Sequence, residues 1–127
     1  MRIAGAALDA MGLAFGTRPG DCLAAIAPAI GPCCYEVDGV VYREFDKEYK
    51  DATPFLTPTS SAKWRLDLWA ANLTQLLESG VRQENVVISR ICTCCNKEKF
   101  FSYRGEDGQT GRMGAFMMLA EGQTDRK

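Results

Sequence analysis

The sequence has no histidine among its 127 residues. A Ser-His-Asp triad and a Cys-His pair both use an imidazole as the general base that activates the nucleophile. Neither arrangement can therefore be built from this chain alone. Any activity that depends on histidine needs residues from outside it.

Long apolar runs are also missing. About 18 consecutive apolar residues are needed to cross a bilayer, and no stretch approaches that length. The apolar start after Arg2 is interrupted by Asp9, and no small-residue cleavage site follows it. We therefore interpret the start as an amphipathic helix rather than a secretory signal, and we expect a cytoplasmic protein with no membrane partner.

An excess of either charge is lacking as well. Fifteen Lys and Arg residues face sixteen Asp and Glu residues, which gives a formal charge of -1. Such a chain has no global field to attract nucleic acid or an anionic membrane. The hydrophobic fraction of 46% and the charged fraction of 24% are instead typical of one globular domain.

Apolar periodicity predicts alternating helices and strands. Three helices are predicted, over residues 2–14, from the N-cap Asp38 onward, and from the N-cap Asp67 to a stop at Gly80. Continuous apolar runs predict strands within residues 22–27, 86–88 and 113–119. The Pro-, Ser- and Thr-rich segment 52–62 predicts a loop. These elements indicate an α/β (α+β) fold, a mixed β-sheet sandwich covered by helices.

The first predicted helix has no N-cap residue. Only Met1 precedes Arg2, where Ser, Thr, Asp or Asn would satisfy the free amides. We therefore expect that the chain begins partway into an element whose start lies upstream.

Six cysteines raise the question of a metal site. Cys92 and Cys95 have a Cys-x-x-Cys spacing, and Cys33 and Cys34 are adjacent. Adjacent residues of an extended chain point to opposite faces, so we do not expect Cys33 and Cys34 to complete a zinc site. The alternative is a non-catalytic thiol or zinc-binding module built on Cys33, Cys34, Cys92, Cys94 and Cys95.

Two arginines are candidate anion ligands. Arg104 and Arg112 flank a glycine-containing loop that can fold back, so their guanidinium groups could hold a phosphate or carboxylate. The alternative is that each makes a structural ion pair, for example with Glu36, Glu106 or Asp107. Glu36 itself is placed either at a pocket rim or in a structural pair.

Four sequence blocks carry a family resemblance: Ile-Gly-Pro-Cys-Cys-Tyr-Glu-Val at 30–37, Leu-Asp-Leu-Trp at 66–69, Phe-Phe-Ser-Tyr-Arg at 100–104 and Thr-Gly-Arg-Met at 110–113. In this order they resemble the C-terminal half of the laccase-domain family, also called multicopper polyphenol oxidoreductases or peptidoglycan editing factors. The resemblance implies that residues 1–120 form part of that family's α/β sandwich, incomplete relative to the whole domain. Residues 121–127 would then be a polar tail.

The resemblance also implies an activity. Family members are purine nucleoside phosphorylases acting on adenosine, inosine, guanosine and methylthioadenosine, with adenosine deamination also reported. Their single zinc or copper ion is held by His, Cys and His in blocks N-terminal to this region. No metal ligand carries over to this chain, so we expect it to bind no family metal and to be inactive alone.

The matching positions suggest substrate-binding residues. We assign Ser102, Tyr103, Arg104 and Arg112 to the phosphate and nucleoside pocket of the intact enzyme. One departure weakens the case that Arg104 and Arg112 together hold an anion, since residues 105–107 read Gly-Glu-Asp where many members have a second arginine. The chain could derive from a start assigned too far downstream, or be one half of a split enzyme. Half of a shared sheet would expose an unpaired edge, so we also expect self-association.

Overall fold

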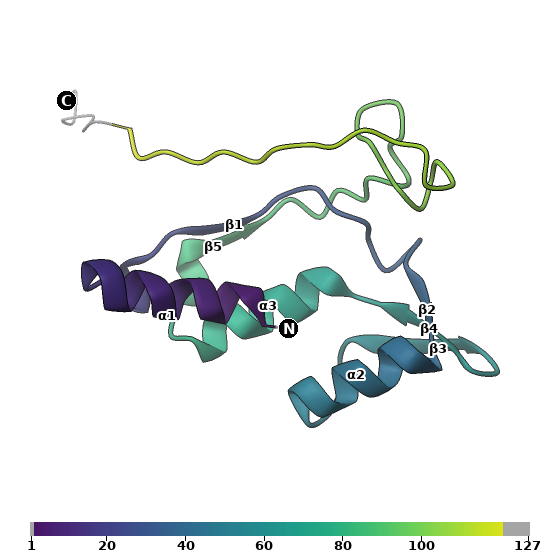
Figure 1. The fold of residues 1–127 in the computed structure, drawn as a ribbon, viewed down its shortest axis with the longest axis horizontal. Coiled ribbons are helices and arrows are strands. Elements are labelled where there is room, and N and C mark those ends of the chain that lie inside the picture. The colour runs from purple at the N-terminus through teal and green to yellow at the C-terminus, as the bar shows by residue number, and fades with distance from the viewer. Residues whose placement is uncertain (1, 121–127) are drawn as a thin grey trace.

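The computed structural model describes residues 2–120, and in that range helices alternate with short strands (Figure 1). The helices are α1 (Ile3–Phe15), α2 (Gly39–Tyr49) and α3 (Leu68–Glu78), with short 3-10 turns η1 (Pro19–Asp21) and η2 (Gln83–Asn85). The strands are β1 (Ala24–Ile26), β2 (Glu36–Asp38), β3 (Leu56–Ser60), β4 (Lys63–Leu66) and β5 (Val86–Ile88). The predicted mixed α/β class is confirmed, with these strands divided between two small sheets. The predicted polar tail, 121–127, lies outside the described residues.

The first sheet is a parallel pair. β1 lies beside β5, with Ala24 opposite Val86 and Ile26 opposite Ile88. Beyond the strands, a further bridge joins Ala29 to Cys92. Helices α1 and α3 pack against each other on one side of this pair (Figure 1). The pairing carries the chain after β1 and the chain after β5 side by side toward the same place.

The second sheet is antiparallel, in the order β2-β4-β3, and α2 packs on it. The buried core here combines residues of the sheet with residues of the segment before β3 and of α3: Val37, Ala52, Phe55, Leu56, Leu66 and Ala71. The predicted loop over 52–62 was wrong, because residues 56–60 form β3. This strand lies at the sheet edge and buries only Leu56, so it tolerates Pro58 and a polar composition.

Helix termini follow the predicted caps. The Asp38 carboxylate accepts hydrogen bonds from the amides of Val40 and Val41 at 2.9 and 3.2 Å, and Asp67 accepts one from Ala70 at 3.0 Å. Helix α1 starts after Arg2 with no side-chain cap and ends at Gly16, whose φ of 67° suits glycine. No helix within residues 2–120 has the length and apolar character to cross a membrane.

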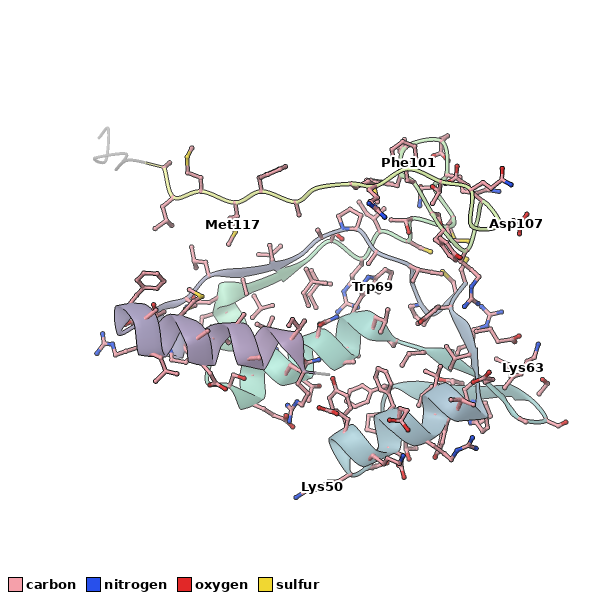
Figure 2. The ribbon with its side chains drawn as sticks, viewed as in Figure 1. Lys50, Lys63, Trp69, Phe101, Asp107 and Met117 are labelled. Carbon is pink, nitrogen blue, oxygen red and sulfur yellow. The ribbon has the colours of Figure 1, made fainter. Side chains whose placement is uncertain are left out.

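The C-terminal run differs from its prediction. Residues 113–119 were expected to form a central strand, but they are extended, belong to no sheet and are exposed, with Phe116 at 99% and Met118 at 90%. The segment crosses the upper part of the view in Figure 1, and Met117 projects from it in Figure 2. A strand needs a hydrogen-bonding neighbour, and no described strand lies in register with this one.

Candidate functional site

A pocket of about 430 Å³ opens between the segment after β1, the start of α3 and the chain that follows β5. Its walls come from segments far apart in sequence: Ile30, Tyr35, Leu68, Thr93 and residues 101–104. Three predicted site residues, Ser102, Tyr103 and Arg104, are therefore brought together in one pocket. Sequence spacing alone did not indicate that Tyr35, Leu68 and Thr93 complete it.

Arg104 is the charged group of this pocket. Its Nη1 donates a hydrogen bond to the backbone carbonyl of Glu36 at 2.8 Å, and its guanidinium carbon lies 5.3 Å from the centre of the Tyr35 ring. Arginine carries five N–H donors, and this bond uses one of them. The contact fixes the side chain and leaves donors for a ligand.

Arg104 also borders a second pocket of about 350 Å³ beside β2, where Glu36 lies at the rim. The Glu36 carboxylate pairs with the Lys63 ammonium at 3.1 Å and accepts a hydrogen bond from Thr59 at 3.0 Å. These two partners, Lys63 first, hold the pKa of Glu36 below its ordinary value. The sequence analysis placed Glu36 either at a pocket rim or in a structural ion pair, and in the structure Glu36 does both.

Arg112 does not join Arg104. It is exposed and makes no hydrogen bond or ion pair to any residue within 2–120. Gly111 before it lies so close to the pocket residue Phe101 that an added Cβ would sit 2.7 Å from the ring. The chain therefore passes the pocket at this point, but the two arginines do not line one cavity, and the role of Arg112 stays a prediction.

Glu106 organises the loop that carries the predicted site residues. Its carboxylate accepts hydrogen bonds from the Ser102 amide at 2.8 Å and from the Thr110 hydroxyl. Ser102 is buried, and its hydroxyl oxygen accepts a bond from the Gly105 amide at 3.2 Å. Glu106 thus ties residues 102–110 into one turn rather than pairing with an arginine.

Removing the Glu106 charge is expected to loosen this turn. The Ser102 amide, the Thr110 hydroxyl and the nearby Lys97 ammonium lower the pKa of Glu106 below its ordinary value of 4.5. Its stabilising contribution is therefore complete above that pH and is lost as the pH falls through the folded-state value. We expect Glu106→Gln to speed amide exchange at Ser102 at pH 7, with the difference from the unsubstituted chain vanishing in acid. Equal exchange in the two proteins at pH 7 would contradict this role.

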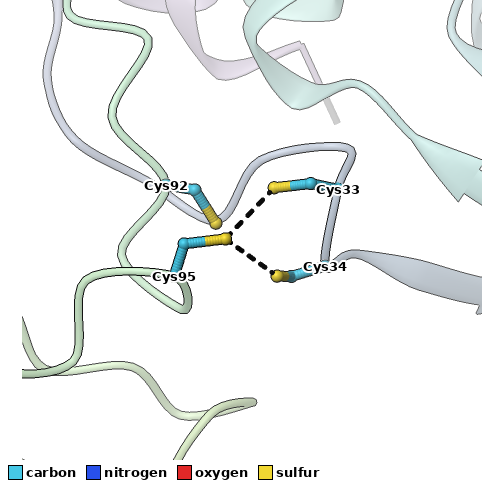
Figure 3. A group of neighbouring side chains, drawn as sticks. All are labelled: Cys33, Cys34, Cys92 and Cys95. Carbon is cyan, nitrogen blue, oxygen red and sulfur yellow. Dashed lines mark hydrogen bonds between the residues drawn. The ribbon is translucent and has the colours of Figure 1, made fainter.

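Four thiols form a compact cluster (Figure 3), and two of them directly neighbour the pocket residues Tyr35 and Thr93 in sequence. The sulfur atoms of Cys33, Cys34, Cys92 and Cys95 all lie within 4.8 Å of one another. The Cys95 sulfur is 3.5 Å from that of Cys33 and 3.4 Å from that of Cys34. The prediction that Cys33 and Cys34 would diverge was wrong.

The reason is the local backbone. Residues 32–34 form a turn rather than an extended segment, and the amides of Cys34 and Tyr35 both donate to the Gly31 carbonyl at 3.0 Å. In a turn, neighbouring side chains can lie on the same side. The Gly31-Pro32 pair was the sequence signal for such a turn. Gly31 is also required by space, because an added Cβ would lie 2.6 Å from the ring of Trp69, in the first turn of α3 (Figure 2).

The thiols differ in their protonation. Burial opposes ionisation of Cys92, but hydrogen bonds from the amides of Gly31 and Cys95 outweigh it and lower the pKa of Cys92 to about 6. Burial, with hydrogen bonds to Cys92 and Cys95, raises the pKa of Cys33 to about 11. The bond to Cys95, together with burial, raises the pKa of Cys34 as well. The cluster therefore favours a thiolate at Cys92.

Comparison with known proteins identifies the family. The sequence model described as multi-copper polyphenol oxidoreductase laccase matches residues 1–120. The chain belongs to this laccase family. The purine nucleoside phosphorylase YlmD of Geobacillus stearothermophilus is 43% identical over 107 residues, and its Bacillus subtilis counterpart is 34% identical over 106 residues.

Solved structures of laccase-family relatives share the fold. The crystal structure of YlmD from Geobacillus stearothermophilus superposes with a TM-score of 0.80 at 38% identity and covers 87% of this chain. The YfiH structure from Bacillus licheniformis gives 0.78 at 30% identity, also over 87% of this chain. The two sequence matches cover 78% and 84% of this chain. The chain spans only 36% and 38% of those curated relatives, and 41% and 42% of the two solved chains.

The metal implied by the laccase family does not fit the donors of this chain. The resemblance implies His, Cys and His ligands, whereas the sequence has no histidine and the clustered donors are all sulfur. Neither imidazole of the expected set can come from these residues. No reaction step of the family can therefore be derived through the thiol cluster.

Proposed function

We propose that this chain forms the C-terminal portion of a purine nucleoside phosphorylase, the name carried by its relatives. The substrates would be phosphate and adenosine, inosine, guanosine or methylthioadenosine, and adenosine deamination would be a second activity. The observation that supports this proposal is the pocket in which Ser102, Tyr103 and Arg104 meet Tyr35.

The pocket offers groups that phosphorolysis would use. A phosphate oxygen forms a bond to the ribose C1′ carbon while the bond from C1′ to the base nitrogen breaks, and the base takes up a proton as it leaves. Arg104 would orient the phosphate through its remaining N–H donors. The rings of Tyr35, Phe101 and Tyr103 offer apolar surface for a purine or ribose. Ser102, being buried and bonded within its own turn, would act by shaping the pocket.

The metal ligands of such an enzyme would come from a segment outside this chain, either N-terminal in the same polypeptide or in a second one. That metal, zinc or copper, would supply charge stabilisation and an activated water for deamination. The chain alone is expected to be inactive. Its exposed apolar segment 113–119 supports the further expectation of self-association or of a covering partner.

Co-expression tests the proposal. We expect the pure 127-residue chain to release no base from inosine and phosphate. We expect base release when it is co-expressed and co-purified with the part of the Geobacillus relative that it does not match. The matched control is the same complement with its histidines replaced by alanine, which should return activity to background.

Two results would count against the proposal. Base release by the pure chain would show that no further segment is required. A well-formed, co-purified complex that releases no base would show that the pocket does not serve phosphorolysis.

A further inference from the structure

The four clustered thiols have the spacing of a metal site. Zinc binds thiolate sulfur at about 2.3 Å, so the sulfurs of a tetrahedral site lie about 3.8 Å apart. Here the Cys95 sulfur lies 3.5 and 3.4 Å from those of Cys33 and Cys34, and all four sulfurs lie within 4.8 Å. Changes in the sulfur separations of up to about 1 Å would give regular coordination.

Other roles for the cluster explain less. A disulfide needs its two sulfurs about 2.05 Å apart, and all six cysteines are free. Buried cysteine often acts as a small apolar side chain, but Cys33 and Cys95 are exposed. Exposed thiols on two distant segments that converge on one point are typical of metal ligation.

We propose that Cys33, Cys34, Cys92 and Cys95 hold one structural zinc ion. Four thiolates close the coordination sphere, leaving no open position for a substrate, so the ion would stabilise structure rather than catalyse. Tetrahedral all-sulfur sites suit zinc or iron, and the Cys92-x-x-Cys95 spacing is that of a zinc knuckle. This inference does not rest on the proposed phosphorylase activity.

Groups around the thiols would support the ion. The Gly31 amide donates a hydrogen bond to the Cys92 sulfur at 3.2 Å, which orients that ligand. The Arg65 guanidinium donates to the Pro32 carbonyl at 3.3 Å, beside Cys33. Four thiolates and one divalent ion carry a net negative charge, and Arg65 places a positive charge next to the turn that bears two of them.

The position of the ion would matter to the pocket. It would join the turn at 32–34 to the loop at 92–95, segments 62 residues apart in sequence at Cys33 and Cys95. Thr93 lies within that loop and Tyr35 directly follows the turn, and both line the pocket. Zinc would therefore hold two walls of the pocket, at Tyr35 and Thr93, in a fixed position next to Arg104.

Metal analysis of the full chain tests the proposal. Purified reduced and refolded with zinc, the chain is expected to retain about one zinc ion per molecule after gel filtration. The pair Cys92→Ser and Cys95→Ser should bring this below about a tenth of an ion, since two of four ligands are lost. Cys22→Ser is the matched control and should keep full stoichiometry, because Cys22 lies outside the cluster and contacts the Arg18 carbonyl instead.

Cobalt titration gives a readout that does not depend on how the variants fold. In the unsubstituted chain, Co²⁺ should produce the thiolate charge-transfer and ligand-field bands of a tetrahedral all-sulfur site, with Zn²⁺ displacing it. Chelation of zinc should also speed amide exchange over residues 92–105. A reduced chain that binds neither metal, a cobalt spectrum of fewer thiolates, iron in place of zinc, or zinc lost from Cys22→Ser would each overturn the assignment.

Discussion

Replacing Leu66 with alanine is expected to lower the free energy of unfolding by about 3 kcal/mol, a large part of the stability of a small domain. Leu66 is 1% exposed and lies in β4 opposite Leu56. Its side chain belongs to the core between the antiparallel sheet and its helix. Truncation removes the buried methyl groups and leaves a cavity, because the backbone is held by a bond from the Leu66 amide to the Tyr35 carbonyl at 2.9 Å.

Urea unfolding measures this loss, and Leu13→Ala is the matched control. Leu13→Ala is the same chemical change at a helical position that is 93% exposed, so it should alter the free energy of unfolding by no more than about 0.5 kcal/mol. If the two variants have equal midpoints, the core is not where the structure places it. A broad, non-cooperative transition in the unsubstituted chain would contradict the prediction for a different reason, since no single free energy would then describe it.

The second large effect concerns Arg104 in the reconstituted enzyme. Under the proposed function, Arg104→Ala is expected to lower kcat/KM for phosphorolysis about 100-fold, because it would remove the positive group that orients the attacking phosphate. Arg104→Lys keeps the charge but loses the planar donor fork that both reaches the Glu36 carbonyl and leaves N–H groups free. It should recover only part of the rate.

Steady-state kinetics with varied phosphate separates binding from chemistry. Arg18→Ala is the control, since Arg18 is an exposed arginine paired with Asp21 and lines neither pocket that Arg104 borders. It should leave kcat/KM unchanged. Full activity of Arg104→Ala would remove this residue from the site, whereas an equal loss in Arg18→Ala would point to a general effect of removing charge.

Local signals in the sequence predicted local structure well. Asp38 and Asp67 cap α2 and α3 as expected, because an N-cap acts on amides only two or three residues away. The short apolar strands at 24–26 and 86–88 were also found from their plain apolar runs, although one face of each stays exposed, at Ala25 and Val87. Segment 56–60 was missed because an edge strand with one exposed face can be polar.

The features that the sequence did not predict depend on contacts between segments that lie far apart in the chain. An apolar run at 113–119 looks like a strand in sequence, but only a neighbouring strand can make it one. The pocket residues 102–104 were predicted from a family block, while Tyr35 and Thr93 joined them through pairing of segments far apart. The thiol cluster was offered by the sequence only as an alternative, because the turn at 32–34 reverses the geometry assumed for an extended chain. The predicted location in the cytoplasm stays a prediction.

The parallel pairing of β1 with β5 also bears on how fast the chain folds. When these two strands pair, they close a loop that contains all of the antiparallel sheet. The entropy cost of closing this loop precedes any gain from the contacts. Chains dominated by such non-local pairings cross their folding barrier slowly. The β2-β4-β3 sheet, whose hairpin is local, should form early, and the meeting of residues 24–34 with 86–95 should be the late, rate-limiting event.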